Sequence, residues 1–204
     1  MLTKLLLVRH GETIWNHVSR YQGHTDVELS DTGREQARLL ADRLSTEKIT
    51  AVYSSDLKRA YETASILAAP HQLRVQMAEE LREINFGVWE GLTYKEISEK
   101  YKELAEKWYQ SPATVRIPKG ETFVELKERA YNAVLKLLKE NDPGTIIVVA
   151  HGGTIRAIIC GLLDIDLNHA FRIQQDNTAL NIIQYNQGFI VLSLLNDTNH
   201  LNNQ

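Results

Sequence analysis

Two histidines of this 204-residue chain each follow a short, apolar, β-prone segment, and each precedes a glycine. His10 lies in the sequence VRHGET after residues 4–8, and His151 lies in VAHGGT at the end of residues 145–150. In an open α/β sheet, ligands bind beyond the carboxyl ends of the strands. If the two strands are neighbours, both imidazoles emerge at one edge of the sheet. The matched pair indicates a site more strongly than either histidine alone.

Two arginines accompany the histidines. Arg9 precedes His10, and Arg59 falls in the first turn of a helix that follows the predicted strand at residues 50–54. A cation at a helix N-terminus costs up to about 1 kcal/mol, and a bound anion would reverse that penalty. Because a guanidinium matches phosphate oxygens with two parallel hydrogen bonds, these residues predict a phosphate pocket. The alternative for Arg59 is a solvated side chain on an exposed face.

Glu83 is the remaining candidate, in the segment LREINFG after the third predicted strand. Apolar neighbours disfavour the charged carboxylate and are expected to keep Glu83 protonated, as a general acid requires. The alternative is that Glu83 is a surface residue of a loop. The glycines after each histidine would allow close backbone turns and leave amides free to donate to an anion.

Strand-like and helical patterns must alternate to bring these residues together. Strands are expected at residues 4–8, 50–54, 73–77, 145–150, 179–185 and 189–195. Helices are expected at residues 32–44, in a segment capped by Asp56, at residues 122–141 and in a segment that ends at Leu162. We expect an α/β fold: a three-layer α/β/α sandwich with a mostly parallel central sheet and an antiparallel edge strand.

A helical insertion is expected after the third strand, at about residues 84–120. This stretch is polar and helix-prone, and it contains a capping-box sequence at Thr93 and Glu96. A second capping box, at Thr122 and Glu125, begins the long helix that follows. Residues 1–204 are expected to form one domain, with a frayed tail after Asn196.

The composition excludes several classes of protein. The formal net charge of -3 disfavours nucleic acid and acidic membrane surfaces as partners. The single Cys160 permits neither an internal disulfide nor a cysteine-rich zinc site, which fits a reducing cytoplasm. The apolar runs are far shorter than the roughly 20 residues that span a bilayer. A cytoplasmic location is therefore expected.

The segment LVRHGET, followed by Trp15 and Asn16, resembles the signature of the histidine phosphatase superfamily, which includes the cofactor-dependent phosphoglycerate mutases. The resemblance extends along nearly the whole chain. The further matching segments are Gln22-Gly23, residues 29–37, residues 54–64, Glu83 and His151-Gly152-Gly153. Several separate motifs in the expected order are more specific than Arg-His-Gly alone.

The resemblance implies a role for each residue of the site. His10 would be the nucleophile that forms a phosphohistidine, and Glu83 would be the proton donor. Arg9, Arg59 and His151 would bind the phosphoryl group. The neighbouring substrate-binding residues would be Asn16, Gln22, Gly23 and Gly152, the last through its amide. The arginines are expected to lower the pKa of His10 and keep its imidazole neutral. This scheme requires no metal and no cofactor.

The same resemblance leaves hydrolysis and mutase chemistry to be separated. Mutases of this family hold a second anionic group with adjacent arginines on a longer insertion, whereas here Arg116 and Lys119 are separated by two residues. The segments FGVWEGLT and PKGET are instead similar to the phosphatase branch, particularly α-ribazole phosphate phosphatases of cobamide synthesis and broad-specificity phosphatases. We therefore expect phosphomonoester hydrolysis, with α-ribazole 5′-phosphate as the preferred substrate. The alternatives are a phosphoglycerate mutase and a broad-specificity phosphatase that acts on sugar phosphates.

Two more distant classes are weaker alternatives. A metal-dependent hydrolase could use His10 and His151 as ligands, but no clustered carboxylates accompany them. A non-catalytic phosphate sensor would need neither a nucleophile nor an acid. The expected partner is a small phosphomonoester, and a homodimer is left open. The further candidates near the site are His17, Arg20, His24 and Arg156. The aromatic residues that could stack on a ring-bearing leaving group, or pack the insertion onto the core, are Phe86, Trp89, Tyr94, Tyr101, Trp108 and Tyr109.

Overall fold

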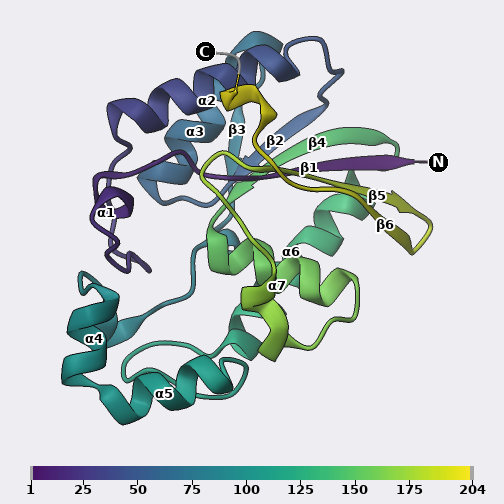
Figure 1. Ribbon diagram of the computed structural model, residues 1–204. Helices are drawn as coiled ribbons and strands as arrows, with labels where there is room; N and C mark the ends of the chain where they lie inside the picture. The colour runs from purple at the N-terminus through teal and green to yellow at the C-terminus, as the bar shows by residue number, and fades with distance from the viewer. Residues whose placement is uncertain (1, 203–204) are drawn as a thin grey trace.

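A central sheet of six strands crosses the structure, a computed structural model that describes residues 2–202 (Figure 1). The strands are β1 (Thr3–Arg9), β2 (Ala51–Ser54), β3 (Val75–Met77), β4 (Gly144–Ala150), β5 (Leu180–Asn186) and β6 (Phe189–Asp197). Their order across the sheet is β3-β2-β4-β1-β5-β6. The pairs from β3 to β1 are parallel, whereas β5 is antiparallel to both β1 and β6. The predicted mostly parallel sheet with an antiparallel edge is confirmed.

Helices cover both faces of this sheet (Figure 1). The covering helices are α2 (Asp31–Leu44) and α3 (Lys58–Ala68) on one face, and α6 (Phe123–Glu140) and α7 (Gly152–Leu162) on the other. In β1, Leu5 and Leu7 belong to the core under α6 and α7, whereas Leu6 and Val8 belong to the core under α2 and α3. A strand buried on both faces has to be apolar at every position. The three-layer arrangement is therefore also confirmed.

Shorter helical segments connect these elements, with η marking a 3-10 helix. They are α1 (Ile14–His17), η1 (Ala69–His71), η2 (Glu79–Leu81), η3 (Gly87–Trp89), α4 (Tyr94–Lys100), α5 (Lys102–Gln110), η4 (Leu167–Arg172) and η5 (Asn199–Leu201). None of the helices in residues 2–202 has the length and apolar character needed to cross a membrane.

The insertion carries η3, α4 and α5, so its predicted helical character is confirmed. Thr93 caps α4 and Thr122 caps α6, each through the predicted capping box. Trp89 and Trp108 are completely buried, with ring centroids 5.4 Å apart. Trp108 also packs 6.0 Å from Phe123, the first residue of α6. These two tryptophans therefore attach the insertion to the core and do not face a leaving group.

Two local predictions were wrong. Asp56 does not cap α3, because its carboxylate pairs with Arg82, whose Nε donates at 2.7 Å. The Lys58 amide at the start of α3 instead donates to Asp26 from a distant loop, at 2.8 Å. The tail after Asn196 is also not frayed as far as residue 202, since His200 is buried beside α2 and hydrogen bonded to Thr178. The last two residues lie outside the described part.

Candidate active site

The carboxyl ends of β1 and β4 bring the two histidines together. The strands are parallel and in register, with Arg9 opposite Ala150, and the His10 amide donates to the Ala150 carbonyl at 3.0 Å. The imidazole rings of His10 and His151 follow directly, with centroids 5.1 Å apart. The prediction that neighbouring strands place both rings at one sheet edge is therefore confirmed.

His10 is held in a form suited to nucleophilic attack. Its Nδ1 lies 2.7 Å from the Gly11 carbonyl, which can only accept, so Nδ1 carries the proton and Nε2 keeps a free lone pair. Burial, followed by the charges of Arg59 and Arg9, holds the pKa of His10 well below its usual value. The predicted influence of the two arginines is confirmed, but burial is the larger cause. The imidazole is neutral at physiological pH.

The His151 ring is completely buried, and neither of its nitrogens has a hydrogen-bond partner within residues 2–202. Burial, then the charge of Arg59, holds the pKa of His151 well below its usual value. Buried ring nitrogens without partners are costly, because their interactions with water are lost and not replaced. A bound polar group could satisfy one of them.

Arg59 is completely buried, with its guanidinium beside the histidines. Two of its nitrogens donate to backbone carbonyls, to Gly23 at 2.7 Å and to Thr25 at 2.9 Å. Gly23 has a φ of +55°, a conformation that favours glycine. Burial lowers the pKa of Arg59 to about 10, so the group stays charged at neutral pH. Within the described chain its Nε has no partner, and no carboxylate forms an ion pair with it.

Arg9, which is half-buried, is the second cation of the site. One terminal nitrogen donates to the Gln175 carbonyl at 2.6 Å, and the buried Nε has no partner in the described chain. Burial lowers the pKa of Arg9 to about 10, against the opposing charge of Glu83. Two guanidinium groups whose buried Nε atoms have no partner strongly attract an anion, because buried surroundings screen their charge only weakly.

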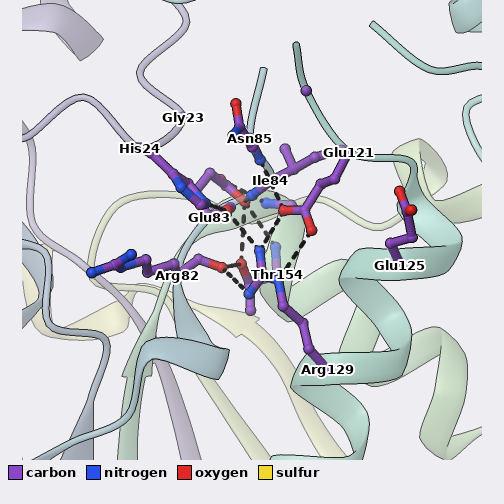
Figure 2. Close-up of polar contacts among 12 residues, drawn as sticks. Gly23, His24, Arg82, Glu83, Ile84, Asn85, Glu121, Glu125, Arg129 and Thr154 are labelled. Atoms are coloured by element: carbon purple, nitrogen blue, oxygen red, sulfur yellow. Dashed lines mark hydrogen bonds and ion pairs between the residues drawn. The ribbon is translucent and has the colours of Figure 1, made fainter. Parts of the chain in front are cut away.

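Glu83 lies at the same site, but its surroundings differ from the prediction (Figure 2). Instead of apolar neighbours, its Oε1 accepts hydrogen bonds from the amides of Ile84 at 2.9 Å and Thr154 at 3.0 Å, and from the Thr154 hydroxyl at 3.2 Å. Its Oε2 accepts only one, from the Gly153 amide at 3.0 Å. The expected apolar environment is therefore wrong. The carboxylate is fixed at the N-terminus of α7, with Oε2 the less occupied oxygen.

A cavity of about 180 Å³ joins these groups. Its lining consists of Arg9, His10, Asn16, Ser19, Arg20, Tyr21, Gln22, Gly23, Arg59, Glu83 and Phe86. Most of the predicted site residues therefore line one cavity. His151 lies behind His10, and Gly152 begins α7 without lining the cavity.

The similarity of the chain to known proteins agrees with this geometry. The profile of the histidine phosphatase superfamily (branch 1) matches residues 5–198. The chain belongs to this superfamily. Phosphoserine phosphatase 1 of Hydrogenobacter thermophilus is 38% identical over 98% of this chain and 95% of its own length. The metal-independent phosphoserine phosphatase of Arabidopsis thaliana is 34% identical over 98% of this chain and 84% of its own.

Solved structures of histidine phosphatases superpose closely on the chain. Bacillus stearothermophilus YhfR has a TM-score of 0.93 at 32% identity and covers 98% of this chain and 99% of its own. A phosphoserine phosphatase of Entamoeba histolytica, in complex with phosphoserine, has a TM-score of 0.88 at 33% identity, with coverage of 98% and 99%. An Escherichia coli protein described as an α-ribazole-5′-P phosphatase has a TM-score of 0.88 at 30% identity, with coverage of 96% and 97%.

Two residues that line the cavity, Ser19 and Tyr21, were not predicted from the sequence. Ser19 has a φ of +52°, and no sequence motif indicates this conformation. Arg20 and Phe86, considered only as further candidates, also line it. The loop after α1 follows no helical or strand periodicity, so only the folded chain shows which of its side chains face inward.

The other candidates, His17, His24 and Arg156, lie outside the cavity lining. His24 lies with Nε2 2.9 Å from the Glu83 carbonyl, and so touches the loop that carries the carboxylate (Figure 2). His17 ends the short helix α1 and does not line the cavity. Arg156 donates through Nε to the Ile173 carbonyl at 2.7 Å. His24 and Arg156 thus contact backbone carbonyls and do not line the cavity themselves.

Proposed function

We propose that this phosphatase hydrolyses a small phosphomonoester through a phosphohistidine at His10, with O-phosphoserine as its preferred substrate. The observation that carries the proposal is the neutral His10, which lines a cavity together with the half-buried Arg9 and the buried Arg59. A neutral imidazole is a competent nucleophile, and buried guanidinium groups stabilise a transferring phosphoryl group.

The first step transfers the phosphoryl group to the enzyme. His10 Nε2 forms a bond to phosphorus while the bond from phosphorus to the leaving oxygen breaks. Glu83 gives its proton to that oxygen, which departs as an alcohol. Oε2 is the oxygen assigned to carry the proton, because it accepts fewer hydrogen bonds than Oε1.

The second step returns the enzyme to its starting state. Water attacks the phosphorus of the phosphohistidine, and Glu83 accepts a proton from that water. The bond between phosphorus and His10 Nε2 breaks, and inorganic phosphate leaves. Arg9 and Arg59 offset the charge of the phosphoryl oxygens in both steps.

Phosphoserine is favoured by the rim of the cavity and by the relatives. Arg20 offers a cation beside the phosphate position, although it also donates to Gly91 and Glu96. A carboxylate on the substrate could pair with it. A cavity of about 180 Å³ suits a phosphate with a short polar leaving group. Proteins named phosphoserine phosphatase are among the relatives that match nearly the whole chain.

α-Ribazole 5′-phosphate is the second candidate substrate. Two aromatic side chains at the cavity, Tyr21 and Phe86, pack edge to face with ring centroids 4.9 Å apart. Such a pair offers an apolar surface to a ring-bearing leaving group. The structural likeness to the Escherichia coli protein described as an α-ribazole-5′-P phosphatase supports the same candidate.

The insertion does not favour a mutase. Arg116 donates to the Gly120 carbonyl at 2.8 Å and pairs with Glu125 at 2.5 Å, and neither Arg116 nor Lys119 lines the cavity. The second anionic group of a bisphosphate or phosphoglycerate therefore has no arginine pair from the insertion in the described chain. Hydrolysis remains the better account of this arrangement.

The test is a substrate series in the presence of EDTA. We expect the highest kcat/KM for phosphoserine, release of inorganic phosphate, and complete loss in His10→Ala. Higher kcat/KM for α-ribazole 5′-phosphate would transfer the proposal to the second candidate, and similar values for many esters would indicate a broad-specificity phosphatase. Interconversion of 3-phosphoglycerate with a bisphosphate primer, without phosphate release, would overturn hydrolysis. Loss of activity with chelator and recovery with a divalent ion would overturn the metal-free scheme.

A further inference from the structure

The loop that carries Glu83 is held from outside the cavity by one ion pair, Glu121–Arg129 (Figure 2). Arg129 projects from α6, and Glu121 precedes the first turn of that helix. Arg129 Nη2 lies 2.5 Å from Glu121 Oε1, and Nε lies 3.1 Å from Oε2. Both side chains are largely buried, at 23% and 16% exposure. Such a two-point pair fixes the plane of the guanidinium.

The fixed guanidinium binds the backbone of the loop at three points. Its Nη1 donates to the carbonyls of Glu80 at 2.7 Å and Arg82 at 2.8 Å. Its Nη2 donates to the carbonyl of Glu83 itself at 2.8 Å. A single side chain therefore contacts three carbonyls of one short segment. The Arg82 carbonyl also accepts from the Thr154 hydroxyl at 2.9 Å, and the Glu83 carbonyl lies 2.9 Å from His24 Nε2.

Glu121 holds the other end of the same loop. Its Oε1 accepts from the Asn85 amide at 2.9 Å, and its backbone amide donates to the Asn85 carbonyl at 3.0 Å. The ion pair thus brackets Glu83 on both sides, from Glu80 to Asn85. It contacts neither the cavity nor the carboxylate of Glu83.

We infer that Arg129, oriented by Glu121, is a positioning residue that sets where the Glu83 carboxyl group delivers its proton. The inference rests on the proposed role of Glu83 as proton donor. On the cavity side, Thr154 and Gly153 fix the carboxylate, and on the outer side Arg129 fixes the backbone from which it projects. A displacement of about 1 Å at a catalytic group can cost about 100-fold in rate.

The dependence on the leaving group tests this inference. p-Nitrophenol leaves readily without a proton, whereas the serine alkoxide needs one. We use kcat/KM, because it reports the steps through phosphoryl transfer and not the later hydrolysis of the phosphohistidine. For Arg129→Met we expect kcat/KM to fall about 10- to 100-fold with phosphoserine and less than about 3-fold with p-nitrophenyl phosphate. Equal losses with both substrates would overturn the inference.

Matched variants separate positioning from folding. Lys136→Met removes an exposed cation from the same helix and should leave both values unchanged. Arg129→Lys keeps the charge but cannot bridge three carbonyls and two carboxylate oxygens, so we expect the same selective loss as in Arg129→Met. A full return of phosphoserine activity in Arg129→Lys would show that charge alone matters and would contradict the inference. If Arg129→Met fails to fold, Arg129→Lys carries the test.

A double-mutant cycle with Glu83→Gln tests whether Arg129 acts through Glu83. If Arg129 acts through Glu83, Arg129→Met should add less than about 3-fold to the loss in Glu83→Gln with phosphoserine. A full additional loss would contradict positioning. Glu83→Gln also tests the proposed function separately: if it slows both substrates equally, the proton-donor role fails. If it is selective for phosphoserine while Arg129→Met is not, only the further inference fails.

Discussion

At the residue scale, the site depends on keeping His10 neutral beside two cations. Its Nδ1 proton is directed to the Gly11 carbonyl, and burial with Arg59 and Arg9 lowers its pKa. The same cations that repel a proton attract the phosphate. In the proposed mechanism, one arrangement therefore both prepares the nucleophile and binds the group that it attacks.

This coupling predicts a shifted pH profile in an arginine variant. Because the pKa of His10 is lowered, protonation that removes the nucleophile should limit kcat/KM only well below pH 6.5. Arg59→Met removes one cause of the lowered pKa, so the acid limb should move to higher pH. We also expect kcat/KM for p-nitrophenyl phosphate to fall about 100- to 1000-fold. The measurement is the pH dependence of kcat/KM for both proteins.

Circular dichroism of Arg59→Met provides the control, because Arg59 also bonds two backbone carbonyls. An acid limb that stays in place, or moves to lower pH, in a folded variant would contradict the electrostatic account of His10.

At the scale of elements, the edge where β1 and β4 end was predictable, and the loops around it were not. Apolar runs that end in His-Gly identify these strand ends, because the central positions of strands buried on both faces are apolar. The contacts of Arg129 with the loop that carries Glu83 were not predictable, since Arg129 and Glu80 are far apart in the sequence and no periodicity relates them. Asp56 shows the converse, because a tertiary ion pair with Arg82 prevailed over a local capping preference.

The contact between α7 and Glu83 gives a prediction about Gly153. A Cβ at this position would lie 2.6 Å from Glu83 Oε1, so the hydrogen-bonded carboxylate would have to move. Alanine favours a helix over glycine by up to about 1 kcal/mol, which offsets the local strain. We therefore expect Gly153→Ala to keep its free energy of unfolding within about 1 kcal/mol, while kcat/KM for phosphoserine falls at least about 10-fold.

Thermal or denaturant unfolding and the two-substrate comparison check this variant together. Unchanged activity with phosphoserine would show that the position of the Glu83 carboxylate has little influence on the reaction.

At the scale of the whole molecule, the C-terminal segment closes onto α2 and reaches the site indirectly. His200 is buried and hydrogen bonded to Thr178, whose amide lies 3.3 Å from the His10 carbonyl. The polar composition of the tail predicted fraying. This prediction failed because composition does not show that α2 offers a surface on which the tail packs. Burial lowers the pKa of His200 to about 4.

This buried histidine predicts sensitivity to acid. The unfolded chain binds a proton at His200 below about pH 6.5, whereas the folded chain resists until about pH 4. The titration of His200 therefore does not affect the free energy of unfolding above pH 6.5. The free energy of unfolding falls as the pH decreases from 6.5 toward 4, because only the unfolded chain binds the proton in this range. His10 and His151 act in the same direction, since their pKa values are also lowered. His200→Gln should show a shallower fall over this range.

Urea unfolding of both proteins at several pH values is the measurement. An identical pH dependence of the unfolding free energy would remove His200 from this account. The His200→Gln variant should keep kcat/KM at neutral pH within about 2-fold of the original value, because the side chain does not line the cavity.

The central claim is a covalent phosphohistidine at His10, and trapping it is the most direct test. In Glu83→Gln, p-nitrophenyl phosphate can still phosphorylate His10, because its leaving group needs no proton, while hydrolysis of the intermediate lacks its base. Rapid quenching at alkaline pH, followed by mass spectrometry of peptides, should find one phosphoryl group on the peptide that contains His10. No covalent phosphate, or phosphate on another residue, would contradict the account.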